Sequence, residues 1–196
     1  MKRCTGIGEK MKTAVIFLAD GFEECEALIV VDILRRAGIE TIMGSIMGRI
    51  EVQSSRNIWV RSDAKAEDID FNTVDLIFLP GGRLGTENLE KCDIVKKQCL
   101  EFADRKMIAA ICAAPSILAG LGLLEGKKAT CHPDFENQMF GAILAKDSVT
   151  VDGNIITGQG LGATFEFAFK LTEMLVSKDI VQKIKKAICW IDWRIV

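Results

Sequence analysis

The chain has 196 residues, of which 49% are hydrophobic and 27% charged, and its net charge is -2. This length and composition fit one globular domain with a sizeable core. The slight negative charge argues against a nucleic-acid surface, which needs a basic excess, and no apolar run approaches the ~20 residues of a membrane span. The apolar run 14–19 is also too short for a signal peptide. We therefore expect a cytoplasmic protein that binds neither nucleic acid nor a membrane.

Short apolar runs alternate with helical patterns along the chain. Residues 13–19 have the length of a buried strand, and the apolar spacing over 24–37 predicts a helix that ends at Gly38. Further strands are expected at 39–44, 74–79, 107–111, 128–131 and 155–157, a hairpin at 50–52 and 58–60, and helices at 94–104, 115–121, 164–177 and 179–188. This alternation predicts an α/β fold with a parallel, doubly wound sheet, whose ligands bind beyond the carboxyl ends of the strands.

A cysteine follows one of these expected strand ends. Residues 106–115 read KMIAAICAAP, so Cys112 lies between a buried strand and a helix that Pro115 can start. The positive end of a helix favours a thiolate, and we expect a lowered pKa for this thiol. Gly82, in the stretch LPGGRLG after another strand, and Ala113 each offer a backbone N–H to an oxyanion.

The seven cysteines include no C-x-x-C pair, and the chain has one histidine. We expect reduced thiols and no zinc site. For any one cysteine the plain interpretation is a small buried hydrophobe.

Two other polar residues also follow expected strands. His132, in ATCHPD, is either a satisfied surface histidine or a general base. Glu26, in GFEECE, either complements a helix dipole or acts as an acid/base partner. Beside a thiolate its carboxyl would stay protonated and donate a hydrogen bond to sulfur.

Six motifs along residues 13–177 together carry a family resemblance. They are GFEECEA, VDILRRAG, LPGGRLGTENL, AAICAAP, ATCHP and GATFEFA. In this order they resemble the ThiJ/PfpI superfamily, and within it the branch of the parkinsonism-associated protein deglycase and its bacterial relatives.

The resemblance implies a flavodoxin-like sandwich of the class I glutamine amidotransferase-like type with a small hairpin, usually a homodimer, and no cofactor or metal. The domain would span 11–188, with an N-terminal extension 1–10 and a tail 189–196. The implied nucleophile is Cys112, the protonated carboxyl partner Glu26 and the nearby histidine His132. Gly82 and Ala113 match the oxyanion donors, and Arg56 and Arg36 match arginines of an anion-binding spot.

The chain departs from the family pattern at two places. Gln159 and Leu161 stand where several relatives carry an arginine and a proline, which puts the anion selectivity of that edge in doubt. The tail residues Trp190 and Trp193 have three possible places: on the domain surface, on a neighbouring subunit, or near the site.

The leading functional hypothesis is a glyoxalase III or deglycase type of enzyme, acting on methylglyoxal, similar dicarbonyls or their early adducts. The rival is a redox sensor or oxidative-stress protein, because an accessible low-pKa thiol is readily oxidised. In that case Cys131 or Cys25 would resolve a sulfenic acid, although we expect both of these cysteines to be buried. A cysteine peptidase or amidase fits less well, because Ala113 rather than a histidine follows Cys112.

Overall fold

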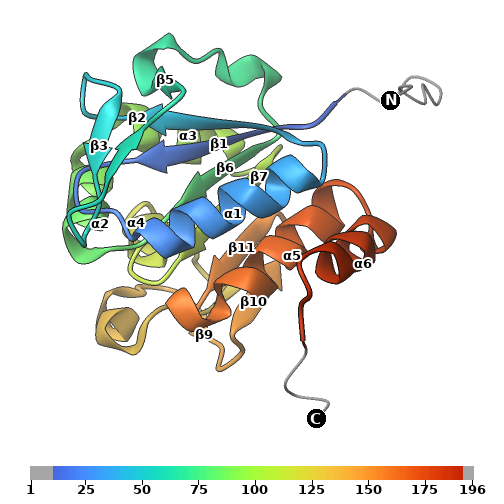
Figure 1. Ribbon diagram of the computed structural model, residues 1–196. Helices are drawn as coiled ribbons and strands as arrows, with labels where there is room; N and C mark the ends of the chain where they lie inside the picture. The colour runs from blue at the N-terminus through green and yellow to red at the C-terminus, as the bar shows by residue number, and fades with distance from the viewer. Residues whose placement is uncertain (1–10, 192–196) are drawn as a thin grey trace.

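The computed structural model describes residues 11–191, and within that range a seven-stranded sheet carries helices on both faces (Figure 1). The strand order is β10-β11-β7-β6-β1-β2-β5, and every neighbouring pair is parallel except β10 and β11. The strands are β1 (Thr13–Leu18), β2 (Glu40–Ser45), β5 (Ala64–Lys65), β6 (Leu76–Leu79), β7 (Met107–Ile111), β10 (Val149–Asp152) and β11 (Ile155–Gly158). The prediction of a mainly parallel, doubly wound α/β sheet is confirmed.

Helices cover the sheet in two layers. One face carries α1 (Glu24–Arg36), α5 (Thr164–Leu175) and α6 (Lys178–Ala187), and the other carries α2 (Arg83–Lys91), α3 (Asp93–Phe102) and α4 (Pro115–Gly120) (Figure 1). Every residue of β1 is buried, and its side chains alternate between the two layers. Ile16 packs in the α1/α5 cluster and Phe17 in the α2/α3/α4 cluster. A strand covered on both faces must be apolar at every position, which explains the unbroken apolar run at 14–19.

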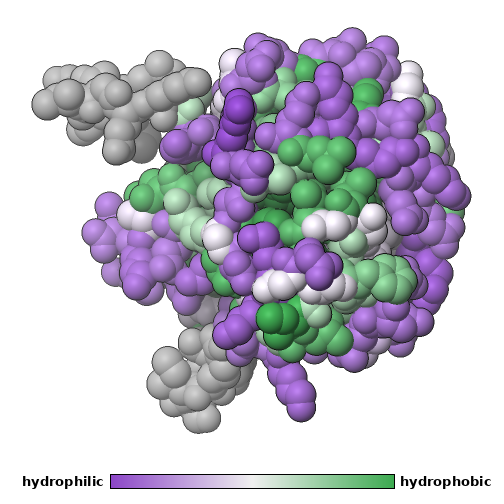
Figure 2. Space-filling view, turned by 180° about the vertical axis from the view of Figure 1, so that it is seen from behind, coloured by the Kyte–Doolittle hydropathy of each residue, from purple (hydrophilic) through white to green (hydrophobic). Residues whose placement is uncertain are grey.

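Short 3-10 helices connect the main elements: η1 (Ala66–Asp68), η2 (Phe71–Thr73), η3 (Pro133–Gln138) and η4 (Leu161–Ala163). Figure 2 views the molecule from behind, where apolar side chains gather near the centre of the face inside a largely hydrophilic rim. Within the described range, no helix has both the length and the apolar character that crossing a membrane requires.

Several elements differ from the sequence-based prediction. Helix α2 was not predicted, because two glycines, Gly81 and Gly82, precede it and its composition is polar. It is held because Gly85 packs against the backbone of Phe22, where an added Cβ would lie 2.7 Å away. The strand expected at 128–131 is the short β8 (Lys128–Ala129), which pairs with β9 (Ile143–Leu144) outside the central sheet. The edge strands β5 and β10 were also not predicted.

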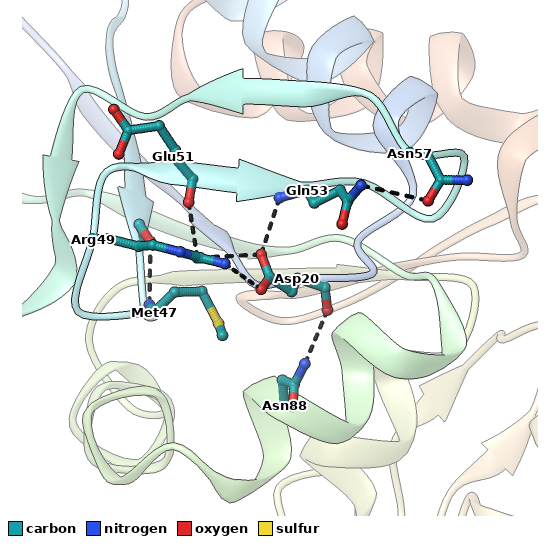
Figure 3. Close-up of polar contacts among 8 residues, drawn as sticks. Asp20, Met47, Arg49, Glu51, Gln53, Asn57 and Asn88 are labelled. Carbon is teal, nitrogen blue, oxygen red and sulfur yellow. Dashed lines mark hydrogen bonds and ion pairs between the residues drawn. The ribbon is translucent and has the colours of Figure 1, made fainter.

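The hairpin of β3 (Glu51–Gln53) and β4 (Trp59–Arg61) is antiparallel, as predicted. Asp20, just past β1, ties it to the sheet (Figure 3). Its carboxylate accepts hydrogen bonds from the Gln53 N–H at 3.0 Å and from the Arg49 guanidinium, while its carbonyl accepts one from Asn88 of α2 at 2.9 Å. One aspartate therefore fixes the hairpin and α2 relative to the end of β1.

The start of the C-terminal tail packs on α5. The Trp190 ring lies 5.0 Å from that of Phe165 and 5.4 Å from that of Phe169, measured between ring centroids. Of the three places considered for Trp190, the structure shows packing on the domain's own surface. Trp193 and the extension 1–10 lie outside the described residues.

Candidate active site

A cavity of about 750 Å³ opens beyond the carboxyl ends of the central strands. Because β1, β6, β7 and β11 are parallel neighbours, the segments that follow them meet at one edge of the sheet. Glu26 comes from the first turn of α1, Gly82 follows β6, Cys112 and Ala113 follow β7, and His132 follows β8. All five of these predicted site residues line the cavity.

Cys112 has an unusual backbone conformation. Its φ is +64°, in the left-handed region that residues other than glycine rarely adopt. Hydrogen bonds on both sides hold it there: its N–H donates to the Gly158 carbonyl at 2.9 Å, and its carbonyl accepts the His132 N–H at 2.8 Å. Non-glycine residues held in this region cluster at functional sites. The strand-to-helix turn thus presents the half-buried thiol to the cavity.

Glu26 is fully buried beside Cys112. Its Oε2 accepts a hydrogen bond from the Gly81 N–H at 2.9 Å. Its Oε1 has no hydrogen-bond partner among the described residues. The carboxyl group as a whole interacts with the Cys112 thiol. Burial raises the pKa of the Glu26 carboxyl to about 7, although the Gly81 and Cys112 hydrogen bonds favour its charged form. A carboxyl that accepts so few donors is well suited to hold a proton at neutral pH.

The thiol pKa does not follow the prediction. Burial is the main cause that raises the pKa of the Cys112 thiol to about 12, and the charge of Glu26 is the next. The backbone N–H groups of Gly82 and Ala113 act in the opposite direction and lower it. The expectation of a lowered pKa from a helix N-terminus is therefore wrong. The helix in question, α4, has only six residues, and its effect is outweighed by burial of the thiol and then by the Glu26 carboxyl next to the sulfur.

His132 shares the cavity with the thiol. A Cβ added at Gly160 would lie 3.7 Å from His132 Cδ2 and 3.9 Å from Cys112 Sγ, so both side chains face the same space. The ring Nδ1 accepts the Asp134 N–H at 3.3 Å, which leaves the proton of a neutral ring on Nε2. Asp134 Oδ2 lies 3.8 Å from the same Nδ1.

The two predicted arginines do not line this cavity. Arg56, in the loop of the β3–β4 hairpin, is exposed and lines a neighbouring depression of about 530 Å³ that shares Glu23, Gly82 and Arg83 with it. Arg36 lies ten residues beyond Glu26 on α1, about 15 Å along a helix axis, and its guanidinium pairs with Asp32 at 2.6 Å. The structure thus leaves Arg36 at the far end of α1.

Sequence reasoning missed two contributors to the site. Gly81, rather than its neighbour Gly82, donates to Glu26, and a glycine pair gives no signal of which member does so. Arg83, the first residue of the unpredicted helix α2, also lines the cavity. It could not be predicted as a site residue without a prediction of that helix. Gln159 and Leu161, the positions that depart from the family pattern, are cavity residues too.

The other cysteines are placed differently from Cys112. All described cysteines are free thiols; Cys25 and Cys189 are exposed, whereas Cys99 and Cys131 are buried. Burial raises the pKa of the Cys131 thiol to about 11, with Glu136 adding to it. The prediction that Cys25 is buried is wrong, since it lies on the outer side of α1. Among residues 11–191, no cluster of three potential metal ligands is found.

Comparison with known proteins places this geometry in a family. The DJ-1/PfpI family model matches residues 12–174. The chain is 38% identical over 179 residues to Parkinson disease protein 7 homolog of Danio rerio, covering 89% of this chain and 95% of that protein. It is 28% identical over 182 residues to glutathione-independent glyoxalase DJR-1.2 of Caenorhabditis elegans, covering 91% and 96%.

Solved structures agree with this result. The crystal structure of Drosophila melanogaster DJ-1beta matches with a TM-score of 0.88 at 33% identity, covering 93% of this chain and 100% of that one. Toxoplasma gondii DJ-1, in an oxidised form, matches with the same TM-score at 32% identity, covering 92% and 100%. The family model spans most of the chain, and the relatives align over nearly their full length. This chain belongs to the DJ-1/PfpI family.

Proposed function

We propose that the protein is a cofactor-independent cysteine enzyme that converts methylglyoxal and similar reactive dicarbonyls, or their early adducts, into hydroxy acids. This is the glyoxalase III or deglycase type of activity. The observation that carries the proposal is the contact of a half-buried thiol, Cys112, with a fully buried carboxyl, Glu26, whose pKa burial raises to about 7. A family relative whose name is glutathione-independent glyoxalase supports it.

The thiol and the carboxyl act as one acidic pair. With pKa values of about 7 and about 12, the pair loses one proton near neutrality and keeps the other. Two backbone N–H groups, those of Gly82 and Ala113, stabilise a charge on sulfur, whereas one, that of Gly81, reaches the carboxyl. We infer that the reactive form is the tautomer of the singly ionised pair in which the charge lies on Cys112 and the remaining proton on Glu26.

The chemistry then proceeds in three balanced steps. The Cys112 thiolate adds to the aldehyde carbon, and the carbonyl oxygen takes a proton to give a hemithioacetal. Glu26, with His132 as a second acid/base group, moves the proton of that carbon to the neighbouring ketone carbon, and the hemithioacetal hydroxyl proton passes to the ketone oxygen. The ketone thereby becomes an alcohol and the attacked carbon becomes a thioester. Water then hydrolyses the thioester, releasing the hydroxy acid and the thiol. A nucleophile with an adjacent acid/base partner is the general arrangement for covalent catalysis.

The test is a methylglyoxal conversion assay on the wild type and on Cys112→Ser, Glu26→Gln and Cys25→Ser. We expect Cys112→Ser to lose turnover and Glu26→Gln to lose at least about 100-fold, the usual range for an acid/base group. Cys25→Ser, a matched change at an exposed thiol outside the cavity, should keep wild-type turnover. A folded Cys112→Ser protein that still converts methylglyoxal would contradict the proposal.

A second candidate function is redox sensing, favoured by the exposure of part of Cys112 beside a carboxyl that can stay protonated. The O–H of Glu26 would then donate to a sulfinate on Cys112. Mild peroxide followed by intact-mass and peptide analysis tests this candidate. Selective gain of two oxygens at Cys112 supports sensing, and oxidation first at the more exposed Cys25 and Cys189 counts against it.

A further inference from the structure

Arg83 is the only arginine or lysine among the described residues that line the Cys112 cavity. It is also shared with the neighbouring depression that Arg56 lines, so it stands at the wall between the two. It begins α2, which Asn88 ties to the end of β1 through the Asp20 carbonyl (Figure 3). The backbone that carries Arg83 is therefore fixed relative to the reactive thiol.

The guanidinium of Arg83 has unused hydrogen-bonding capacity. It makes no hydrogen bond to any described residue, and its one ion-pair contact, to Asp134 Oδ2, is at 4.0 Å, beyond hydrogen-bond distance. The Phe135 ring lies under it, 5.2 Å from centroid to Cζ. A guanidinium presents several N–H donors in a planar fork that matches a carboxylate or phosphate. Arg83 is thus held over an aromatic ring with its donors open to a ligand.

Besides Glu26, three carboxylates line the cavity, and each has a polar neighbour. Glu23 accepts the Ser55 hydroxyl at 2.9 Å, Glu166 accepts the Ser148 hydroxyl at 2.7 Å, and Asp134 lies beside both Arg83 and His132. Their charges oppose an anion anywhere in the cavity. A negatively charged ligand is therefore favoured where it contacts the Arg83 fork directly, since Arg83 is the one arginine or lysine among the described lining residues.

We propose that Arg83 is a specificity-determining residue that directs carbonyl compounds bearing a carboxylate or phosphate group to Cys112. The inference deepens the proposed function, on which it rests for the identity of the reaction. The charged group of the substrate binds the guanidinium while its carbonyl carbon faces the thiol. Asp134 competes for the same guanidinium and weakens the preference.

Two alkylating reagents that differ in charge test this without any turnover. With iodoacetate or iodoacetamide the Cys112 sulfur attacks the CH₂ carbon, the S–C bond forms, and iodide leaves with the electrons of the C–I bond. The measurement is the ratio of the iodoacetate rate to the iodoacetamide rate at the Cys112 peptide. Arg83→Gln should lower that ratio at least threefold, and Asp134→Asn should raise it.

The controls distinguish direct contact of the reagent with Arg83 from an effect of the protein's net charge. Arg105→Gln removes an equal charge at the opposite, amino-terminal edge of β7 and should leave the ratio unchanged. The exposed Cys25, which does not line the cavity, reports the intrinsic reagent ratio in every variant. An unchanged ratio at Cys112 in folded Arg83→Gln overturns the proposal. A lowered ratio in a protein that fails to convert methylglyoxal supports Arg83 and defeats only the proposed function.

Discussion

Glu26 and Cys112 are in contact because the residue between them, Gly81, has no side chain. A Cβ at Gly81 would lie 2.5 Å from Glu26 Oε2 and 2.6 Å from Cys112 Cβ. The same residue donates its N–H to Oε2. The acid/base pair therefore depends on a glycine that supplies both the space and one hydrogen bond.

Gly81→Ala should separate the pair. The added methyl group overpacks a buried site, so we expect a loss of about 1–3 kcal/mol in the free energy of unfolding and a large loss of turnover. Denaturant unfolding and the methylglyoxal assay measure the two effects. Gly120→Ala, at a glycine with nothing within 4 Å of its Cβ, is the matched control and should be neutral or slightly stabilising. Wild-type turnover in Gly81→Ala would show that the contact is not needed.

The alkylation rate of Cys112 by iodoacetamide should rise with pH through about 7, where the pair loses its first proton. An isolated thiol titrates higher, at about 8.5. In Glu26→Gln no acidic partner shares the proton. Burial then raises the thiol pKa against the Gly82 and Ala113 N–H groups, and the rise should move above pH 8. Peptide-resolved alkylation rates between pH 5 and 10 measure this. The same midpoint in both proteins would rule out proton sharing.

The raised pKa of Glu26 also makes the free energy of unfolding depend on pH. Its pKa is raised in the folded state, so the folded protein binds the proton more tightly than the unfolded chain does. The stabilisation is complete below pH 4.5 and is lost as the pH rises to about 7. The shift corresponds to about 3 kcal/mol. Relative to wild type, Glu26→Gln should therefore gain about this much in free energy of unfolding between pH 4.5 and pH 7.5.

Glu24→Gln is the control of opposite sign. Burial opposes ionisation of Glu24, but hydrogen bonds from its own backbone N–H and from the Ser54 and Ser55 hydroxyls outweigh burial and lower its pKa. The stabilisation that Glu24 contributes is therefore present above the pKa that this carboxyl has in the unfolded chain, and it is lost as the pH falls. Denaturant unfolding of each variant at several pH values separates the two. Parallel pH profiles for the Glu26 and Glu24 variants would contradict the assignment.

Asp20→Ala should loosen the β3–β4 hairpin. It removes the acceptor of the Gln53 N–H and of the Arg49 guanidinium (Figure 3), and we expect a loss of about 1–2 kcal/mol because the pair is partly exposed. Hydrogen exchange at Gln53 should speed up more than exchange within β1. Glu51→Ala, which removes a nearby carboxylate that forms no hydrogen bond or ion pair with a described residue, should leave exchange unchanged.

The family resemblance also predicts a homodimer. Size-exclusion chromatography with light scattering should give twice the chain mass of 21.6 kDa. A mass of one chain at micromolar concentration would contradict this prediction.

The central strands and helices, and the position of the site at strand ends, could be predicted from sequence because a local sequence pattern encodes each of them. The run at 14–19 is apolar throughout, and Cys112 directly follows another such run. The helix at 83–91 was not predicted, because the contacts that position it are tertiary: Gly85 lies close to the Phe22 backbone, and Leu89 is fully buried. Strand β8 leaves the central sheet because it pairs with β9, a partner that no local pattern specifies.

Local sequence patterns were enough to predict the fold class, the family resemblance, and the roles of Cys112 and Glu26 as candidate site residues. The pKa of the thiol could not be predicted from them, because burial and distance to a carboxyl depend on how β7, α1 and the glycine turn after β6 pack together. It also left Arg36 at the far end of α1 and put Arg83 at the cavity wall. Charge, proton affinity and ligand contact are properties of neighbours in space, and neighbours far apart in sequence are set by the packing of the sheet.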